Sequence, residues 1–234
     1  MNESIRFDLQ DEVAVIYLDD QKANALTPAT LTDLTNALTR AQKEAKAVVL
    51  VGRPGRFSAG FDLKIMGSGA DAATALVKTG CDFFMGLYGH PQPVVAACTG
   101  HAIAGGAALL LCSDHRVGTE GEFSIGFNEV KIGLPMPLFI SELAQERLAR
   151  NVLCSATLLA RTFSPTEAVA AGFLDEITAP DELVATSIAR AKDLARLPAN
   201  AYASTKRSLR GPFISHIRAS LDDDMERVVA DGSF

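Results

Sequence analysis

Two glycine-bearing loops constrain this chain more than any other feature, because each follows an apolar strand-like run and leads into a helix. They are FSAGFDLK at 57–64 and GHAIAGGAALLLCSD at 100–114. Glycine allows a backbone to approach a ligand closely, and the first N–H groups of a helix have no partner within that helix. If both loops meet in one pocket, two backbone donors face one oxygen atom, which is the arrangement of an oxyanion hole. The pattern therefore predicts chemistry on a carbonyl or thioester group.

The glycine pair Gly105–Gly106 stands where a helix is expected to start. A glycine inside a helix costs roughly 1 kcal/mol relative to alanine, so either close packing or close approach of a ligand must justify the pair. The sequence contains neither of the nucleotide-binding patterns G-x-x-x-x-G-K-[ST] and G-x-G-x-x-G, nor the hydrolase pattern G-x-S-x-G. In the first loop, Asp62 is expected to cap the turn that follows.

Strand-like and helix-like segments alternate along the first half of the chain. Apolar runs typical of strands buried on both faces are 12–19, 47–52 and 93–98. Between them, apolar residues recur at helical spacing over 28–45 and 70–88. This alternation predicts right-handed crossover connections and a mostly parallel sheet.

After about residue 134 the pattern changes to helices separated by Pro or Gly. The expected helices are 138–149, 150–160, 165–171, 181–196, 199–210 and 213–230. The chain is therefore predicted to consist of an α/β core over residues 1–185, followed by a C-terminal helical region over residues 186–234 that serves packing or oligomerisation.

Composition and charge limit the expected partners. Apolar residues make up 48% of the chain and charged residues 21%, which is typical of a soluble globular protein. The net charge of −6 argues against nucleic-acid binding. The longest apolar run, at 102–112, is shorter than the roughly 18 residues of a membrane span and is expected to be a buried helix. Neither a nucleic acid nor a membrane is therefore an expected partner.

The N-terminus and the cysteines favour a cytoplasmic protein. The charged start of the chain lacks the basic and then apolar leader of a secreted protein. Cys81, Cys98, Cys112 and Cys154 are widely spaced and mostly lie among apolar neighbours. They are expected to be buried thiols and neither metal ligands nor disulfides.

One carboxylate is the candidate acid–base group. Glu129 lies in FSIGFNEVKIGLPMP at 123–137, with Phe127 and Val130 beside it. Desolvation among such neighbours would raise the pKa of this carboxyl and make it a better proton acceptor near neutral pH. A surface glutamate at a strand end is the alternative that this segment leaves open.

Other polar side chains carry weaker signals. The histidines His90, His101, His115 and His216 show no metal or triad spacing, and no metal site is predicted. His101 stands beside the second loop and could line its pocket, although a hydrogen-bonded loop histidine is the alternative. Lys22 could meet phosphate groups from a loop.

Taken together, these motifs resemble the crotonase superfamily, which comprises enoyl-CoA hydratases and isomerases. The matching segments are QKANALTPATLTDL, FSAGFDLK, PVVAACTGHAIAGGAALLLCSDHRV, FNEVKIGLPMP and SPTEAVAAGFLDEI, and they cover most of residues 12–210 in the family order. The resemblance implies an α/β fold built as a crotonase-like spiral of ββα units with a helical C-terminal region. It also implies a homotrimer or a dimer of trimers, and an acyl-CoA substrate without a separate cofactor.

Carried over by motif position, the resemblance assigns the oxyanion amides to Phe61 and Gly105 and the acid–base role to Glu129. The residues expected at the adenine and phosphate end of coenzyme A are Lys22, Ala23, Ala59 and Asp62. The first of the two glutamates that family hydratases use to place water is replaced here by Ala108, which we assign to the substrate pocket. The acyl pocket is expected to be lined by the helix at 70–88, which includes Leu87, and by Met66, Met136 and Leu138.

A lone glutamate favours one reaction within this family. Alanine can neither orient a water molecule nor exchange a proton, so Ala108 argues against hydration. A single carboxylate can take a proton from C2 of a 3-enoyl thioester and return it at C4, which is a Δ3–Δ2 isomerisation. A 2-enoyl-CoA hydratase is the first alternative, and a non-catalytic acyl-CoA binder is the second alternative. Racemisation, decarboxylation and dehalogenation also stay open, as does the acyl chain length.

Overall fold

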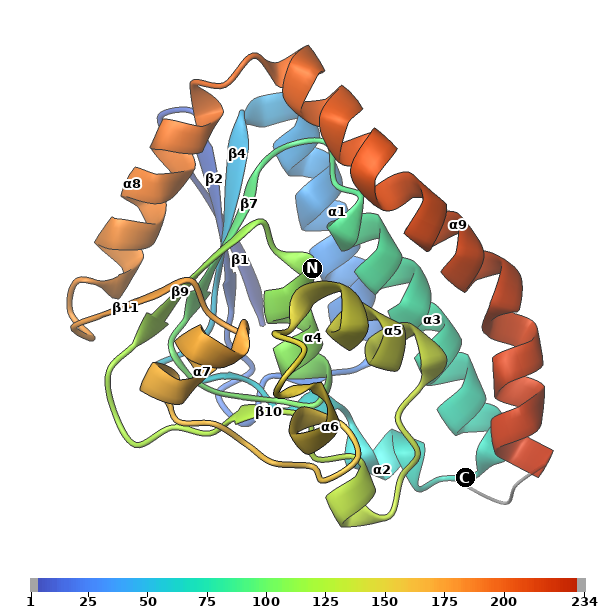
Figure 1. Ribbon diagram of the computed structural model, residues 1–234. Coiled ribbons are helices and arrows are strands. Elements are labelled where there is room, and N and C mark those ends of the chain that lie inside the picture. Colours follow the sequence, from blue (N-terminus) through green and yellow to red (C-terminus); the bar gives the residue numbers. More distant parts are fainter. Residues whose placement is uncertain (1–3, 231–234) are drawn as a thin grey trace.

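The computed structural model describes residues 4–230, and a six-stranded sheet lies at its centre (Figure 1). The strand order in this sheet is β1-β2-β4-β7-β9-β11. The strands are β1 (Ile5–Gln10), β2 (Val13–Leu18), β4 (Ala47–Val51), β7 (Val94–Cys98), β9 (His115–Thr119) and β11 (Glu176–Thr178). β1 runs antiparallel to β2, and the other neighbouring strands are parallel. The prediction of a mostly parallel sheet is therefore confirmed.

Shorter strands form two small parallel sheets beside the main one. The first has the order β10-β8-β5, and the second pairs β3 with β6. These strands are β3 (Ala25–Leu26), β5 (Gly55–Ser58), β6 (Gly60–Phe61), β8 (Gly100–Ile103) and β10 (Ile125–Gly126). After β4 and again after β7, the chain passes through short strands into a helix, α2 (Leu63–Met66) or α4 (Gly105–Cys112). This repeat is the spiral of ββα units that the resemblance implied.

Both faces of the main sheet are buried along its central strands β2, β4 and β7, because these strands are apolar on both faces. Val15 of β2 packs in the cluster that contains buried side chains of α8 (Leu183–Ala195). The next residue, Ile16, points into the larger core, which includes α1 (Pro28–Glu44) and α3 (Ala70–Tyr88). Figure 1 shows α8 on one side of the sheet and α1 and α3 on the other.

The C-terminal helices differ from the prediction in two places. They are α5 (Leu138–Arg147), α6 (Leu153–Ala156), α7 (Pro165–Ala171), α8 and α9 (Ala199–Ala230). The helix expected over 150–160 is reduced to the short α6. The two helices expected over 199–210 and 213–230 are one continuous helix, α9, with Pro212 inside it, so the break predicted there is wrong.

Contacts with the core on both sides of Pro212 hold α9 together. Before the proline, Lys206 Nζ and Arg210 Nη1 pair with the carboxylate of Asp114 at 2.6 Å and 2.9 Å. After it, the side chain of Ile217 is buried in the core. Proline inside a helix costs about 3 kcal/mol, because it lacks an N–H and crowds the preceding turn. Buried ion pairs and apolar packing offset that cost here.

The cysteines follow the prediction at three of four positions. Cys81, Cys98 and Cys112 are buried, and burial raises the pKa of each thiol to about 12. Cys154 is exposed, so the expectation of burial is wrong there. It lies on α6, a short surface helix on which its neighbours Leu153 and Ser155 are only partly buried.

No helix within residues 4–230 is long and apolar enough to cross a membrane. In that same part of the chain, His, Cys, Asp and Glu side chains do not gather in groups of three that could hold a metal ion.

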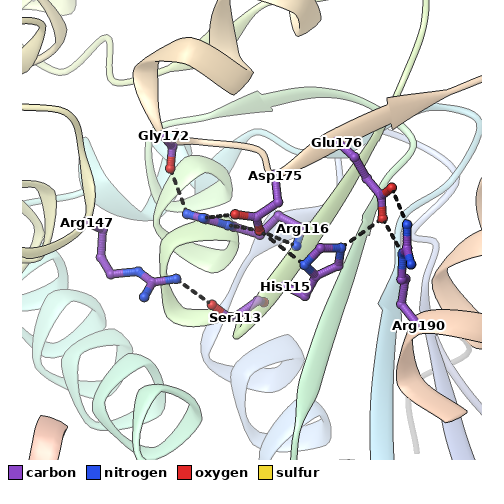
Figure 2. Close-up of polar contacts among 8 residues, drawn as sticks. All are labelled: Ser113, His115, Arg116, Arg147, Gly172, Asp175, Glu176 and Arg190. Carbon is purple, nitrogen blue, oxygen red and sulfur yellow. Dashed lines mark hydrogen bonds and ion pairs between the residues drawn. The ribbon is translucent and has the colours of Figure 1, made fainter. Parts of the chain in front are cut away.

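A network of charged side chains ties the segment after α7 to the main sheet (Figure 2). Arg116 on β9 donates through Nε and Nη2 to Asp175 at 2.8 Å and 2.6 Å, and through Nη1 to the Gly172 carbonyl at 2.7 Å. The neighbouring His115 lies 2.8 Å from Glu176 through Nε2. The Arg116 side chain is only 8% exposed, so its charge depends on Asp175.

Replacing Asp175 by alanine is expected to lower the free energy of unfolding by about 3 kcal/mol, because it leaves a buried guanidinium without its carboxylate. Urea denaturation measures this change. The matched control is Asp8→Ala, since the Arg6–Asp8 pair is exposed and such pairs contribute about 0–1 kcal/mol. Equal losses in the two variants would contradict the prediction.

Candidate active site

The two glycine loops meet, which is the condition for a shared pair of backbone donors. Gly60 has a φ of +83°, which favours glycine, and a Cβ added there would lie 2.6 Å from the Gly105 nitrogen. Gly105 is the first residue of α4, so its N–H has no partner within the helix. The backbones of the two loops therefore touch at the point where the oxyanion amides were expected.

The start of α4 explains the glycine pair. A Cβ at Gly106 would lie 2.1 Å from the Ser58 carbonyl oxygen, so close packing requires glycine there. The helix begins at Gly105, later than the expected 102–112, because residues 100–103 form β8. Ala104, which precedes the helix, has a φ of +55° and a ψ of −123°, a conformation rare for residues other than glycine. Backbone strain of this kind is concentrated at ligand-binding sites.

Asn24, which sequence reasoning missed, holds the first loop against β3. It is fully buried, and its Nδ2 donates to the carbonyls of Leu18 at 2.7 Å and Phe57 at 3.1 Å. Ser58 Oγ donates to the Asn24 carbonyl at 2.7 Å and accepts from the Gly60 amide at 3.1 Å. The N-A-L segment carried the signal, because a buried asparagine must satisfy its amide.

Three of the residues expected near coenzyme A lie together at this loop. The Ala59 amide donates to the Ala23 carbonyl at 3.0 Å, and the side chain of Lys22 is exposed next to it. Asp62 accepts from two amides of α2 at 2.8 Å and 3.2 Å. The expectation that Asp62 caps this turn is confirmed.

Glu129 is buried, so the alternative of a surface glutamate is wrong. It immediately precedes the short helix Val130–Ile132, and its carbonyl accepts from the Leu134 amide at 2.9 Å, which closes the turn around it. The side chain is 7% exposed, and Oε2 is buried without a hydrogen-bond partner. Desolvation raises the pKa of this carboxyl to about 7, which confirms the direction that its apolar neighbours predicted.

A small cavity of about 60 Å³ joins Glu129 to both loops. Its wall is apolar apart from two side chains, Asn128 and Glu129. The residues that line it are Ala59, Phe61, Leu63, Met66, Ala104, Asn128, Glu129, Ile132, Leu134, Pro135, Pro137 and Ile140. The Asn128 side chain, also missed from the sequence, has its Oδ1 buried without a partner. The cavity can thus present one desolvated carboxylate to carbon atoms of an apolar ligand.

Several expected pocket residues lie outside this cavity. Ala108 is fully buried inside α4, and Leu87 is equally buried in the core. Met136 lies in a separate surface groove beside α5 and α6. His101 accepts from the Ser124 amide at 3.0 Å through Nδ1, which agrees with the alternative of a hydrogen-bonded loop histidine.

Comparisons with known proteins agree with this geometry. Residues 8–227 match the family model described as enoyl-CoA hydratase/isomerase. A putative enoyl-CoA hydratase from Thermus thermophilus is 34% identical over 194 residues, which cover 79% of this chain and 75% of that protein.

Two solved structures are similar over nearly the whole chain. An enoyl-CoA hydratase/isomerase family protein from Pseudomonas syringae has a TM-score of 0.93 at 38% identity, covering 95% of this chain and 97% of that one. Human mitochondrial delta3-delta2-enoyl-CoA isomerase also has a TM-score of 0.93, at 25% identity, covering 97% of this chain and 91% of that one. The named relatives therefore include both hydratases and isomerases.

Proposed function

Because this chain belongs to the enoyl-CoA hydratase/isomerase family, we propose that it acts on acyl-CoA thioesters and shifts a double bond from the Δ3 to the Δ2 position. One observation carries the choice of isomerisation. Glu129 is the only ionisable side chain among the described residues that line the cavity. Isomerisation needs one group that accepts and returns a proton, whereas family hydratases place water with two glutamates.

In the proposed reaction, Glu129 takes a proton from C2 of a 3-enoyl thioester. The electrons of the broken C–H bond form a double bond between C1 and C2, and the carbonyl electrons move onto the thioester oxygen, which gives a dienolate that still holds the C3–C4 double bond. The amides of Phe61 and Gly105 hold that oxygen as its negative charge develops. The protonated carboxyl then returns the proton to C4, which leaves a double bond between C2 and C3. Coenzyme A is part of the substrate, and the reaction consumes no further cofactor.

An assay with two substrates tests this proposal. Isomerisation of 3-hexenoyl-CoA creates the absorbance of a conjugated thioester, whereas hydration of crotonyl-CoA removes it. We expect the first signal and little of the second. Rapid loss of crotonyl-CoA absorbance without isomerisation would instead support the hydratase alternative. Tight binding of both thioesters without turnover would support the non-catalytic binder.

The hydratase alternative has one supporting observation. Asn128 is the other polar side chain of the cavity, and its Oδ1 has no partner. It could help Glu129 to hold a water molecule in place of the glutamate that Ala108 replaces. Asn128→Leu should therefore reduce any hydration of crotonyl-CoA more than it reduces isomerisation.

The rate should depend on pH through Glu129. Its pKa is raised to about 7, and only the ionised form accepts a proton. We expect kcat/KM for 3-hexenoyl-CoA to fall about tenfold per pH unit below 7 and to be constant above pH 8. A rate that stays constant down to pH 5 would contradict this assignment, because it would require an ordinary carboxyl pKa.

The family resemblance further leads us to propose a homotrimer or a dimer of trimers. Leu158 and Leu159 are adjacent and 68% and 72% exposed, which supports an interface near α6. Light scattering on the purified protein measures the oligomeric state directly.

A further inference from the structure

The ring of Phe61 separates the cavity from α3. Phe61 lines the cavity, and its ring also lies against Gly80 of α3. A Cβ added at Gly80 would lie 2.2 Å from Cζ of the ring. The ring therefore occupies a notch on α3 that exists because residue 80 has no side chain.

A second aromatic layer supports the ring from behind. Phe84, one turn further along α3, is fully buried and meets Phe61 edge-on, with ring centroids 6.0 Å apart and an interplanar angle of 68°. Phe84 in turn packs against Phe139 of α5 at 5.6 Å. Edge-on aromatic contacts of this kind contribute about 0.5–1.5 kcal/mol each beyond their buried area. The Phe61 ring is thus part of a packed wall.

This wall leaves little room for an acyl chain. The cavity measures about 60 Å³. By this measure a cavity needs about 10–15 Å³ to hold one water molecule, so this one holds only a few groups of that size. Any longer chain would have to leave through the mouth, where Leu63 is 62% exposed, or displace the Phe61 ring.

We propose that the Phe61 side chain restricts the site to short acyl groups, with Gly80 as the residue that positions the ring. The inference rests on the proposed acyl-CoA function and adds the substrate class to it. Phe61 then has two separate roles. Its backbone amide belongs to the oxyanion hole, whereas its ring limits the acyl chain, so replacing the side chain leaves the amide in place.

Binding of saturated thioesters tests the proposal without requiring turnover. Burying one methylene group contributes about 0.8 kcal/mol, which is about a fourfold gain in affinity. We expect the wild-type Kd values for butanoyl-CoA and decanoyl-CoA to differ by less than about threefold, because the longer tail finds no buried space. In Phe61→Ala, decanoyl-CoA should bind at least ten times more tightly than butanoyl-CoA. Isothermal titration calorimetry measures all four values.

Three further variants sharpen the test. Phe61→Leu replaces the ring by a smaller aliphatic group and should give an intermediate ratio, so the result does not depend on one variant folding well. Gly80→Ala pushes the ring towards the cavity and should weaken butanoyl-CoA binding at least fivefold. Phe123→Ala is the matched control, since that ring packs on His101 outside the cavity and its removal should leave the ratio unchanged.

Two results would overturn the proposal while leaving the proposed function intact. One is a wild-type protein that already binds decanoyl-CoA at least ten times more tightly than butanoyl-CoA. The other is a Phe61→Ala variant with the wild-type ratio. If the wild type bound neither thioester, the acyl-CoA function itself would be wrong, and the chain-length inference would fail with it.

Discussion

Replacing Glu129 by glutamine is expected to lower the turnover of 3-hexenoyl-CoA by about 10²–10⁴-fold at pH 8. Glutamine has nearly the same shape but can neither accept nor return the proton. The loss should appear in kcat, because the carboxylate acts on the reacting carbons and the two loops that bind the thioester are unchanged. A Glu129→Gln variant with near wild-type turnover would refute the proposed mechanism.

The same substitution should make the protein more stable. The pKa of Glu129 is about 7 in the folded chain, against 4.5 for an ordinary glutamate. The folded state therefore binds more protons than the unfolded state between these values, and its stability falls as the pH rises through them. Above pH 7 the buried carboxylate costs on the order of 3 kcal/mol, which glutamine avoids.

Denaturation at pH 5 and at pH 8 measures this effect. The gain from Glu129→Gln should be larger at pH 8, where the wild-type carboxyl is ionised. Glu122→Gln is the control, because Glu122 is exposed in the same segment and should change stability little at either pH. Loss of activity together with a gain of stability would distinguish a catalytic carboxylate from a residue that merely supports the fold.

Replacing Gly60 by alanine is expected to lower kcat by about 10²–10³-fold, which is the typical effect of losing one oxyanion donor. The new Cβ would lie 2.6 Å from the Gly105 nitrogen and 2.9 Å from the Ala104 Cβ. Backbone atoms cannot yield at that distance without moving one loop away from the other. The amides of Phe61 and Gly105 would then no longer converge on one oxygen atom.

Gly55→Ala is the matched control for this variant. Gly55 has a φ of +79°, close to the +83° of Gly60, but an added Cβ would meet nothing within 4 Å. Both variants therefore carry similar backbone strain, and only Gly60→Ala disturbs the loop contact. Thermal denaturation should show comparable losses from strain, whereas turnover should fall only in Gly60→Ala. Equal turnover in the two variants would contradict the role of this contact.

Features that depend on near neighbours in the chain could be predicted from the sequence. The cap at Asp62 and the strands at 47–52 and 93–98 each depend on residues a few positions away. The burial of Glu129, which the sequence left open, depends also on distant residues such as Phe61 and Ala104. A local signal was misleading at Pro212, where the helix-breaking tendency of proline predicted two helices. The ion pairs of Asp114 with Lys206 and Arg210 join residues far apart in the chain, so this prediction did not take them into account.

The sequence by itself determined the alternation of buried strands and helices in the core, the two glycine loops and the one carboxylate among apolar residues. Only the tertiary structure decided which side chains share the cavity with Glu129, and that Ala108 and Met136 lie outside it. The tertiary structure alone also set the Phe61 ring into the notch at Gly80. The physical reason is that strand periodicity, caps and turns are local properties of the backbone. The volume and lining of a cavity depend instead on how residues far apart in the chain pack together.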